Sequence, residues 1–211
     1  MELELLNIFD QDRNHVGVAT RGEVHRIGHW HEVFHCWFVG REDERDYIYL
    51  QLRSPLKKDY PNLLDITAAG HLLADETVQD GVREIQEELG IDVAFEELVS
   101  LGILDYCVIN EKMIDKEFSH VFLYEYHGTF DDFCLQKEEV SGIVRVMFDE
   151  FCELLTGTKE EIRITGFTTN ENKEKTWIDT VVGKSKFVTH DPSYYQNVIT
   201  LIGWHLDRRN E

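Results

Sequence analysis

The sequence predicts an α/β or α+β fold, because segments with the two-residue period of strands are interspersed with segments of helical period. Its 211 residues, 42% of them hydrophobic and 11% aromatic, are enough to bury a substantial core. The predicted strands are Glu2–Phe9, Val16–His25, Glu32–Val39, Tyr47–Arg53, Leu98–Asn110, Phe118–Tyr126 and Val140–Val146. The predicted helices are Thr77–Leu89, Phe148–Leu155 and Pro192–Arg208.

Polar and charged turns separate the first strands. The turn Asp10–His15 follows the first strand, and the charged turn Gly40–Asp46 joins the third and fourth strands into a hairpin with a long loop. The region Thr158–Lys175 is charged and shows no period that assigns it to a helix or a strand.

The last predicted helix has a clear start and a clear buried face. Asp191 can cap it, and Pro192 suits the first helical position. Its apolar stripe predicts that it packs on the core, and consists of Tyr195, Val198, Ile199, Ile202 and Leu206.

The excess of acidic residues limits the kinds of partner that the chain is expected to bind. The chain carries 41 acidic and 21 basic residues, a net charge of −20. Nucleic-acid polymers are bound largely by Lys and Arg that neutralise phosphates, so this balance argues against such a partner and against an anionic membrane surface. Small phosphorylated substrates are compatible with it, because a metal ion and a few basic residues offset the repulsion locally.

Several features predict a soluble cytoplasmic protein. The N-terminus, MELELLNIFDQDRN, lacks the basic and apolar segments of a signal peptide. No apolar stretch approaches the roughly 20 residues of a membrane span. Buried reduced thiols are expected for the cysteines, which lie in apolar stretches without a C-x-x-C pair: Cys36, Cys107, Cys134 and Cys152.

The most informative segment is GHLLADETVQDGVREIQEELGI, from Gly70 to Ile91. Thr77 and Asp80 form a T-x-x-D capping box at the start of the expected helix, and Gly90 is placed to end it in a left-handed conformation. One narrow apolar stripe should pack on a sheet, and consists of Val78, Val82, Ile85 and Leu89.

Three glutamates project from another sector of this helix. Glu84, Glu87 and Glu88 stand at spacings i, i+3 and i+4, so helix geometry brings their carboxylates together. Like charges at this spacing destabilise a helix, and a divalent cation removes the repulsion. Carboxylate oxygens suit Mg²⁺, or Mn²⁺ as a substitute, with waters and substrate phosphates completing the octahedron. A solvated acidic face is the alternative that three glutamates alone leave open.

The detailed pattern resembles the Nudix box, G-x5-E-x7-R-E-U-x-E-E-x-G-U, in which U is an apolar aliphatic residue. Only six residues separate Glu76 from Arg83, where the pattern has seven, so the pairing of Glu76 with the box arginine is an open question. The fixed letters of the pattern are supplied by Gly70, Glu76, Arg83, Glu84, Ile85, Glu87, Glu88, Gly90 and Ile91.

The resemblance implies an α/β Nudix fold, an α/β/α sandwich in which a central mixed sheet carries a loop–helix–loop metal site. One domain would span residues 1–211, with a core over about 31–157. A strand extension over about 1–30 would precede the core, and an extension over about 158–211 with the terminal helix would follow it.

The resemblance also implies the site residues. Glu84, Glu87 and Glu88 would bind Mg²⁺ together with the carbonyl of Ala69, and Arg83 would orient the carboxylates. The implied activity is Mg²⁺-dependent hydrolysis of the diphosphate linkage in a small nucleotide-like or organic diphosphate. Homodimers are common among such enzymes, so a homodimer is a further expectation.

The reaction also needs a general base, and several carboxylates can supply it. Glu87 or another box glutamate is one candidate, and Glu138 or Glu139, further along the chain, is another. The sequence does not choose among them.

A wider resemblance, over roughly Gly22 to Gly90, is to the Nudix subfamily related to isopentenyl diphosphate isomerase. That enzyme has an R-S-x-x-K-x-x-x-P stretch that helps to hold the substrate diphosphate, and Arg53, Ser54, Lys57 and Pro61 match it here. Arg53 and Lys57 are therefore the candidates for substrate-phosphate binding. The segment LLDITAAGH ahead of the box lacks the cysteine that isomerases need, which favours hydrolysis. A non-hydrolytic isomerase-like enzyme and an inactive ligand-binding module are the alternatives.

Histidines gather near the third predicted strand. On one continuous strand, His25, His29, His31 and His35 would share a face, where imidazoles could bind Zn²⁺. Gly28 interrupts such a strand, and no cysteine or carboxylate stands at ligand-like spacing. Pocket-lining, surface and packing roles are therefore the alternatives.

Overall fold

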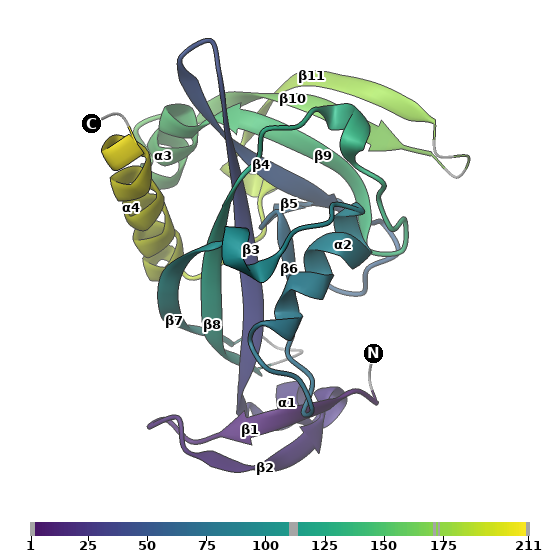
Figure 1. The fold of residues 1–211 in the computed structure, drawn as a ribbon, viewed down its shortest axis with the longest axis vertical. Coiled ribbons are helices and arrows are strands. Elements are labelled where there is room, and N and C mark those ends of the chain that lie inside the picture. The colour runs from purple at the N-terminus through teal and green to yellow at the C-terminus, as the bar shows by residue number, and fades with distance from the viewer. Residues whose placement is uncertain (1–2, 110–113, 171, 173, 210–211) are drawn as a thin grey trace.

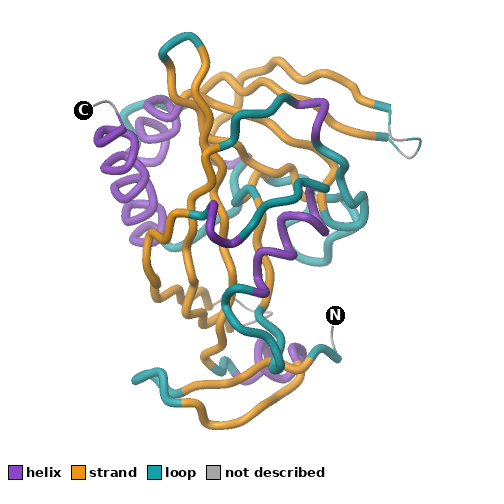
Figure 2. The backbone as a smooth tube through the Cα atoms, in the orientation of Figure 1, coloured by secondary structure: helices purple, strands orange, loops and turns teal. Residues whose placement is uncertain are grey.

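The computed structural model describes residues 3–109, 114–170, 172 and 174–209, and its strands form one sheet with helices on both faces (Figure 1, Figure 2). The strands are β1 (Leu5–Phe9), β2 (His15–Thr20), β3 (Trp30–Glu42), β4 (Arg45–Arg53), β5 (Leu64–Asp65), β6 (Ala68–His71), β7 (Val99–Ile109), β8 (Ile114–Glu125), β9 (Val140–Met147), β10 (Glu161–Thr169) and β11 (Lys175–Gly183). The helices are α1 (Arg21–Ile27), α2 (Arg83–Leu89), α3 (Phe148–Thr156) and α4 (Pro192–Arg209). Short 3₁₀ helices cover Asp80–Val82, Phe95–Glu97, Phe130–Asp132 and Lys184–Lys186.

Strand β3 organises the sheet. Its C-terminal half pairs antiparallel with β4, which leads through β9 and β10 to β11. β8 runs parallel to β3 and carries β7 on its other side, while β6 and β1 pair with the N-terminal half of β3. The combination of parallel and antiparallel neighbours confirms the predicted mixed sheet.

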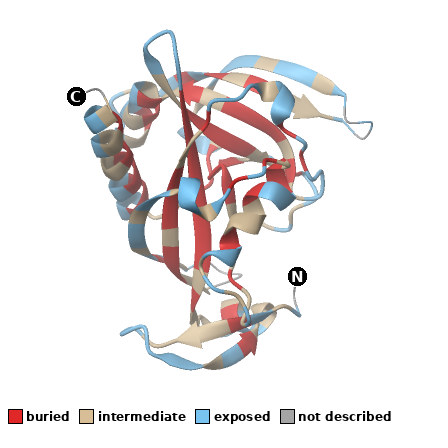
Figure 3. Ribbon diagram, viewed as in Figure 1, coloured by how far each residue is buried: buried red, intermediate tan, exposed pale blue. Residues whose placement is uncertain are grey.

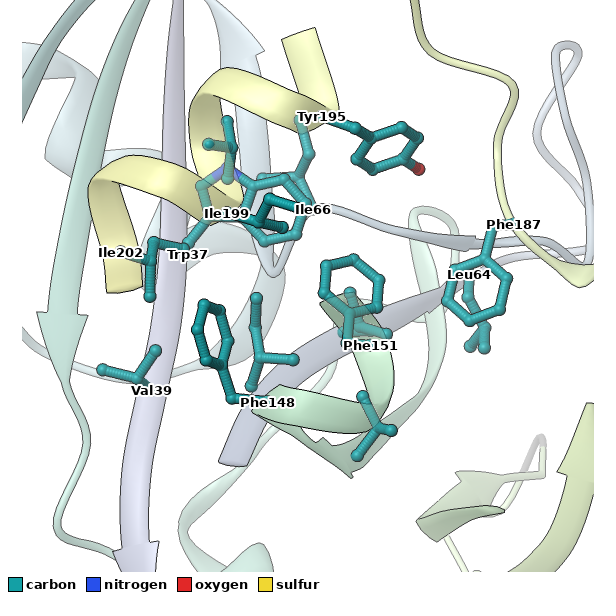
Figure 4. Close-up of a cluster of buried hydrophobic side chains, with 14 of the residues drawn as sticks. Trp37, Val39, Leu64, Ile66, Phe148, Phe151, Phe187, Tyr195, Ile199 and Ile202 are labelled. Carbon is teal, nitrogen blue, oxygen red and sulfur yellow. The ribbon is translucent and has the colours of Figure 1, made fainter. Parts of the chain in front are cut away.

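Alternate residues of β3 face two separate cores, as the pleat of a strand requires. Phe34 belongs to the core that α2 covers with Ile85 and Leu89. Trp37 faces the opposite core, which α3 and α4 cover (Figure 4). Buried residues accordingly follow the central strands and the inner faces of these helices (Figure 3). Helices therefore cover both faces of the sheet, which confirms the expected α/β/α sandwich.

The terminal helix α4 begins and packs as predicted. The backbone N–H of Ser193 donates to Asp191 Oδ1 at 2.7 Å, so Asp191 caps the helix. The predicted stripe is buried at every position, from Tyr195 to Leu206. No helix in the described part of the chain is long and apolar enough to cross a membrane.

The β3–β4 hairpin is confirmed, but its loop is shorter than predicted. The strands continue to Glu42 and resume at Arg45, so Asp43 and Glu44 alone form the turn. Both have positive φ, 49° and 61°, as the tightest hairpin turns require. The charged residues of Gly40–Asp46 lack the alternation of apolar and polar residues that indicates a strand, so the sequence predicts a turn over the whole range.

The predicted strand Val16–His25 is wrong over its second half, where the chain forms α1. The hydroxyl of Thr20 accepts a hydrogen bond from the N–H of Glu23 and caps this helix. Gly28, at φ 82°, ends it with an N–H bond to the carbonyl of Val24.

The predicted helix Thr77–Leu89 begins later than expected. A turn and a 3₁₀ segment, Asp80–Val82, precede α2, which starts at Arg83. Asp80 accepts hydrogen bonds from the N–H and the hydroxyl of Thr77 at 2.8 and 2.7 Å, so half of the predicted capping box is present. Gly90 ends the helix in the left-handed region at φ 71°, as predicted.

The unassigned region Thr158–Lys175 contains β10 and the start of β11, an antiparallel pair. Glu2 and Asn110, which the predicted strands included, lie outside the described residues. All four cysteines are free, and Cys36 is buried as predicted. Cys107 and Cys134 are exposed, contrary to the prediction.

A buried ion network ties the loop after β4 to the segment before α4. Asp65 accepts from Arg53 Nη1 at 2.8 Å and contacts His190 Nε2 at 2.7 Å. Arg53 also donates to the carbonyl of Asp59 through Nε and Nη2, at 3.3 and 2.9 Å. Burial alone would raise the pKa of Asp65, but the charges and hydrogen bonds of His190 and Arg53 outweigh it and hold the pKa well below its usual value.

Replacing Asp65 with Asn should destabilise the fold by about 3–5 kcal/mol at pH 7, because it leaves the partly buried Arg53 and the buried His190 without their shared counter-ion. The carboxylate has a lower pKa in the folded than in the unfolded state. Its contribution is therefore full above the unfolded pKa of about 4 and is lost as the pH falls through the folded pKa. Urea unfolding at pH 7 and pH 3 measures both effects, and the difference from the unmodified chain should shrink at pH 3.

A matched control is Asp179→Asn, which removes the carboxylate of an exposed pair with Arg163. That variant should leave the urea midpoint nearly unchanged. Equal stability of Asp65→Asn and the unmodified chain at pH 7 would contradict a structural role for the buried network.

Candidate active site

The box glutamates lie on the wall of one cavity of about 580 Å³. Helix α2 supplies Glu84, Glu87 and Glu88, and β6 supplies Ala69 and Gly70. The structure thus brings together all four predicted metal ligands.

The three glutamates differ in how they are held. Glu88 is buried, and its Oε2 accepts from the N–H of Ala69 and from Gln51 Nε2, both at 3.2 Å. Glu84 accepts from Arg83 Nη1 at 2.5 Å. Glu87 is 52% exposed at its side chain and lies 3.2 Å from the same Arg83 nitrogen.

Arg83 is itself held by Glu76, in spite of the residue missing between them. Its Nε and Nη2 donate to the two carboxylate oxygens of Glu76 at 2.5 and 2.9 Å. A further bond from Nη2 reaches the carbonyl of His71 at 3.2 Å. The hydrogen bonds that Arg83 donates to Glu76 are the main reason that the pKa of Arg83 is raised. The 3₁₀ turn ahead of α2 is compatible with this bidentate pair, which answers the question that the short spacing left open.

Burial and mutual repulsion destabilise the ionised form of two box carboxylates, those of Glu84 and Glu88. Burial, with the charge of Glu87 added, raises the pKa of Glu84 to about 7, although Arg83 opposes the shift. Burial and the charge of Glu84 raise the pKa of Glu88 well above its usual value. Buried oxygens that disfavour negative charge are a donor set that a hard divalent cation stabilises, so these residues fit Mg²⁺ or Mn²⁺.

The box carboxylates line the cavity without converging on one point. In the described residues, their oxygens do not all lie within 4.8 Å of one another, because Arg83 draws Glu84 and Glu87 to itself. The half-exposed Glu87 has room to rotate toward a shared cation.

Lys57 reaches this cavity, and Arg53 does not. Lys57 Nζ forms an ion pair with Glu139, and both side chains line the cavity. The guanidinium of Arg53 is anchored to Asp59 and Asp65 and lines only a second, adjoining cavity. Among the candidate bases, Glu139 lines both cavities, whereas Glu138 lines only the second.

The second cavity, of about 740 Å³, adjoins the first, and the two share several lining residues. Arg21 on α1 lines both, and sequence reasoning missed it because this stretch was predicted as a strand. The helix signals were Thr20 ahead of it and Gly28 behind it. The walls shared by the two cavities are formed by Arg21, His35, Lys57, His71, Glu117 and Glu139.

Histidines form a cluster beside the second cavity, which His25 and His71 line, but in a different set from the predicted one. His25, His31 and His71 have ring nitrogens within 4.8 Å of one another, and His31 is equally close to carboxylates of Asp115 and Glu117. The parallel pairing of β3 with β8 places His31 opposite Glu117. Strands β3 and β8 are far apart along the chain, so the spacing of residues in the sequence could not reveal these carboxylates as neighbours of His31.

The cluster has the chemistry of a transition-metal site. His31 Nε2 and Asp115 Oδ1 are buried, 3.7 Å apart, and make no hydrogen bond with the described residues. Burial lowers the pKa of His31 to about 4, so its imidazole is neutral at pH 7 and free to donate a lone pair. Neutral imidazoles with carboxylates suit Zn²⁺ or Mn²⁺. His29 takes no part, and His35 instead bonds Tyr194 at 2.7 Å.

Known proteins are similar to this chain in sequence and in fold. The model of the NUDIX domain matches residues 28–166. An uncharacterized Nudix hydrolase from Clostridium acetobutylicum is 38% identical over 199 residues, which cover 94% of this chain and 97% of that protein. An isopentenyl-diphosphate Δ-isomerase from Photorhabdus laumondii is 26% identical over 129 residues, 61% of this chain and 68% of that one.

A crystal structure from Deinococcus radiodurans has a similar fold, with a TM-score of 0.57 at 17% identity over 74% of this chain and 91% of that one. The domain match covers more than half of the chain, and the Clostridium relative covers nearly all of it. The chain therefore belongs to the Nudix hydrolase family, with a more distant likeness to isopentenyl diphosphate isomerases, and is an enzyme that acts on pyrophosphate bonds.

Proposed function

We propose that this Nudix protein is a Mg²⁺-dependent hydrolase that cleaves the diphosphate linkage of a small nucleotide-like or organic diphosphate. The observation that carries the proposal is the convergence of the box glutamates, Arg83 and the Lys57–Glu139 pair on one cavity. Acidic groups for a cation and a basic group for a phosphate thus meet where a diphosphate could bridge them.

Each residue has a distinct task in this proposal. Glu84, Glu87, Glu88 and the carbonyl of Ala69 would hold the cation, which would supply charge neutralisation of the diphosphate and acidification of a bound water. Arg83, fixed by Glu76, keeps the carboxylates in place.

Lys57 and Glu139 act on the substrate and on water. The ammonium of Lys57 offsets charge on the diphosphate as the bond to the leaving phosphate breaks. Glu139 is the candidate base that we favour outside the box, because it lines the glutamate cavity whereas Glu138 does not. The ion pair with Lys57 holds the carboxylate of Glu139 in that cavity.

Glu87→Gln should lower turnover by about 100-fold or more while leaving the fold intact, because it removes a ligand charge from an exposed side chain. Release of phosphate or pyrophosphate from a panel of organic diphosphates measures turnover, and calorimetric titration with Mg²⁺ should show weaker binding. Glu96→Gln, at an exposed glutamate outside both cavities, is the control. Unchanged turnover in Glu87→Gln would mean that the metal site has been misplaced.

Lys57→Ala should raise KM for a diphosphate substrate about tenfold, or about 1.4 kcal/mol, with a smaller effect on unfolding. The ammonium is well placed to meet the phosphate, since it lines both cavities and is paired with Glu139. The matched control is Lys159→Ala, which breaks an ion pair with Glu150 on α3. If KM stays the same in Lys57→Ala, Lys57 does not contact the substrate.

Gly70→Ala should impair metal binding with little loss of stability. A Cβ at this position would lie 2.1 Å from the carboxyl carbon of Glu84, so the flexible carboxylate must move away from the cavity wall. Gly203→Ala is the control, because its nearest neighbour would lie 3.8 Å away. Mg²⁺ affinity equal to that of the unmodified chain would show that the position of Glu84 is not critical.

A further inference from the structure

The wall of the second cavity includes a histidine from outside the matched Nudix region. His190 lies between the 3₁₀ segment Lys184–Lys186 and α4, beyond residue 166, where the domain match ends. It nevertheless lines the cavity together with Val188 and Tyr106. The C-terminal segment thus completes a chamber whose other walls come from α1 and from the Nudix core.

The imidazole of His190 is held in one orientation. Its Nε2 lies 2.7 Å from Asp65 Oδ1, and the two side chains are 8% and 7% exposed. The rings of Tyr194 and Tyr195 flank it, with centroids at 5.4 and 5.1 Å. Because the carboxylate accepts from Nε2, the Nδ1 edge is turned away from Asp65, toward the hydroxyl of Tyr106 at 3.3 Å.

This edge leaves hydrogen-bonding capacity for a ligand. The contact between His190 and Tyr106 is at the long end of the hydrogen-bond range, and a phenol oxygen has further lone pairs. A hydrocarbon packed against the pair would desolvate these groups without replacing their bonds to water. A ligand hydroxyl or N–H group would satisfy them, because it donates a hydrogen bond to these lone pairs.

The position of the chamber decides which part of a substrate meets this edge. Lys57 and Glu139 line both cavities, so a diphosphate held at Lys57 and the box glutamates would direct its attached group into the second cavity. Its volume of about 740 Å³ is within the range of about 300–1,000 Å³ that ligand pockets occupy.

We propose that His190 is a specificity-determining residue, which with the hydroxyl of Tyr106 selects organic diphosphates whose attached group carries hydroxyls or heteroatoms over those whose attached group is a hydrocarbon. This inference rests on the proposed function, because it assumes that the diphosphate binds at the box glutamates. A site built to bond a polar group rejects an analogue without one far more strongly than an apolar site rejects an added hydroxyl.

The test compares two probes, ADP-ribose as the hydroxylated diphosphate and geranyl diphosphate as the hydrocarbon one. In the unmodified chain, kcat/KM for ADP-ribose should exceed that for geranyl diphosphate by at least about 100-fold. His190→Phe keeps a ring but removes the polar edge, and should reduce this ratio at least about tenfold, mainly through KM for ADP-ribose.

Tyr106→Phe is a second variant, which tests the proposal even if His190→Phe misfolds. It removes one hydroxyl and leaves the Asp65–His190 pair intact. It should shift the ratio in the same direction. A purely structural defect would lower activity on both probes alike and leave the ratio unchanged, which would overturn the proposal. A preference of the unmodified chain for geranyl diphosphate would overturn it as well.

Calorimetric binding of the same two probes, with Mg²⁺ and the Glu87→Gln variant, separates this proposal from the proposed function. Tighter binding of ADP-ribose that is lost when His190→Phe is added supports the assignment of His190 even if no turnover is found. Absence of turnover in the unmodified chain would then count against hydrolysis alone. Equal binding of both probes would overturn the role of His190.

Discussion

The gathering of negative side chains around one cavity is the constraint on which the rest of the structure depends. Glu84 and Glu88 are withdrawn from water next to each other, and burial raises the pKa of both. Arg83 and Lys57 offset part of that charge, each through an ion pair that also fixes its own position. The fold supplies the rigid frame, because the apolar side of α2 is anchored in a core and β6 is paired with β3. In our proposal, a divalent cation added to this site stabilises it by offsetting the remaining negative charge.

Local patterns sufficed where chemistry and structure are both encoded in one short segment. The box, its end at Gly90 and the cap of α4 at Asp191 were all predicted, since each depends on residues a few positions apart. Prediction failed at α1, where Val16 to Ala19 looked like the start of a longer strand and the cap at Thr20 was overlooked. The site residues that were missed come from distant elements. His71, Asp115 and Glu117 meet His31 only through the pairing of β3 with β6 and β8.

Two electrostatic centres of different chemistry share the walls of the joined cavities. The glutamates offer hard oxygen donors, whereas the histidine cluster offers imidazole nitrogens with two carboxylates. His71 connects them, since it belongs to the cluster and its carbonyl accepts a hydrogen bond from Arg83. The Nδ1 edge of His190, next to the hydroxyl of Tyr106, is a third feature of these cavities. In our proposal it contacts the substrate and not the metal ion.

The most direct test of the central claim is where a divalent cation binds. Crystals grown with Mn²⁺, whose anomalous scattering locates the ion, should show it bound by Glu84, Glu87 and Glu88 near the carbonyl of Ala69, at metal–oxygen distances of about 2.0–2.4 Å. Glu87 should then have turned away from Arg83 toward the ion. Mn²⁺ found only at His25, His31 and His71, with Glu84 and Glu87 still paired to Arg83, would contradict the account.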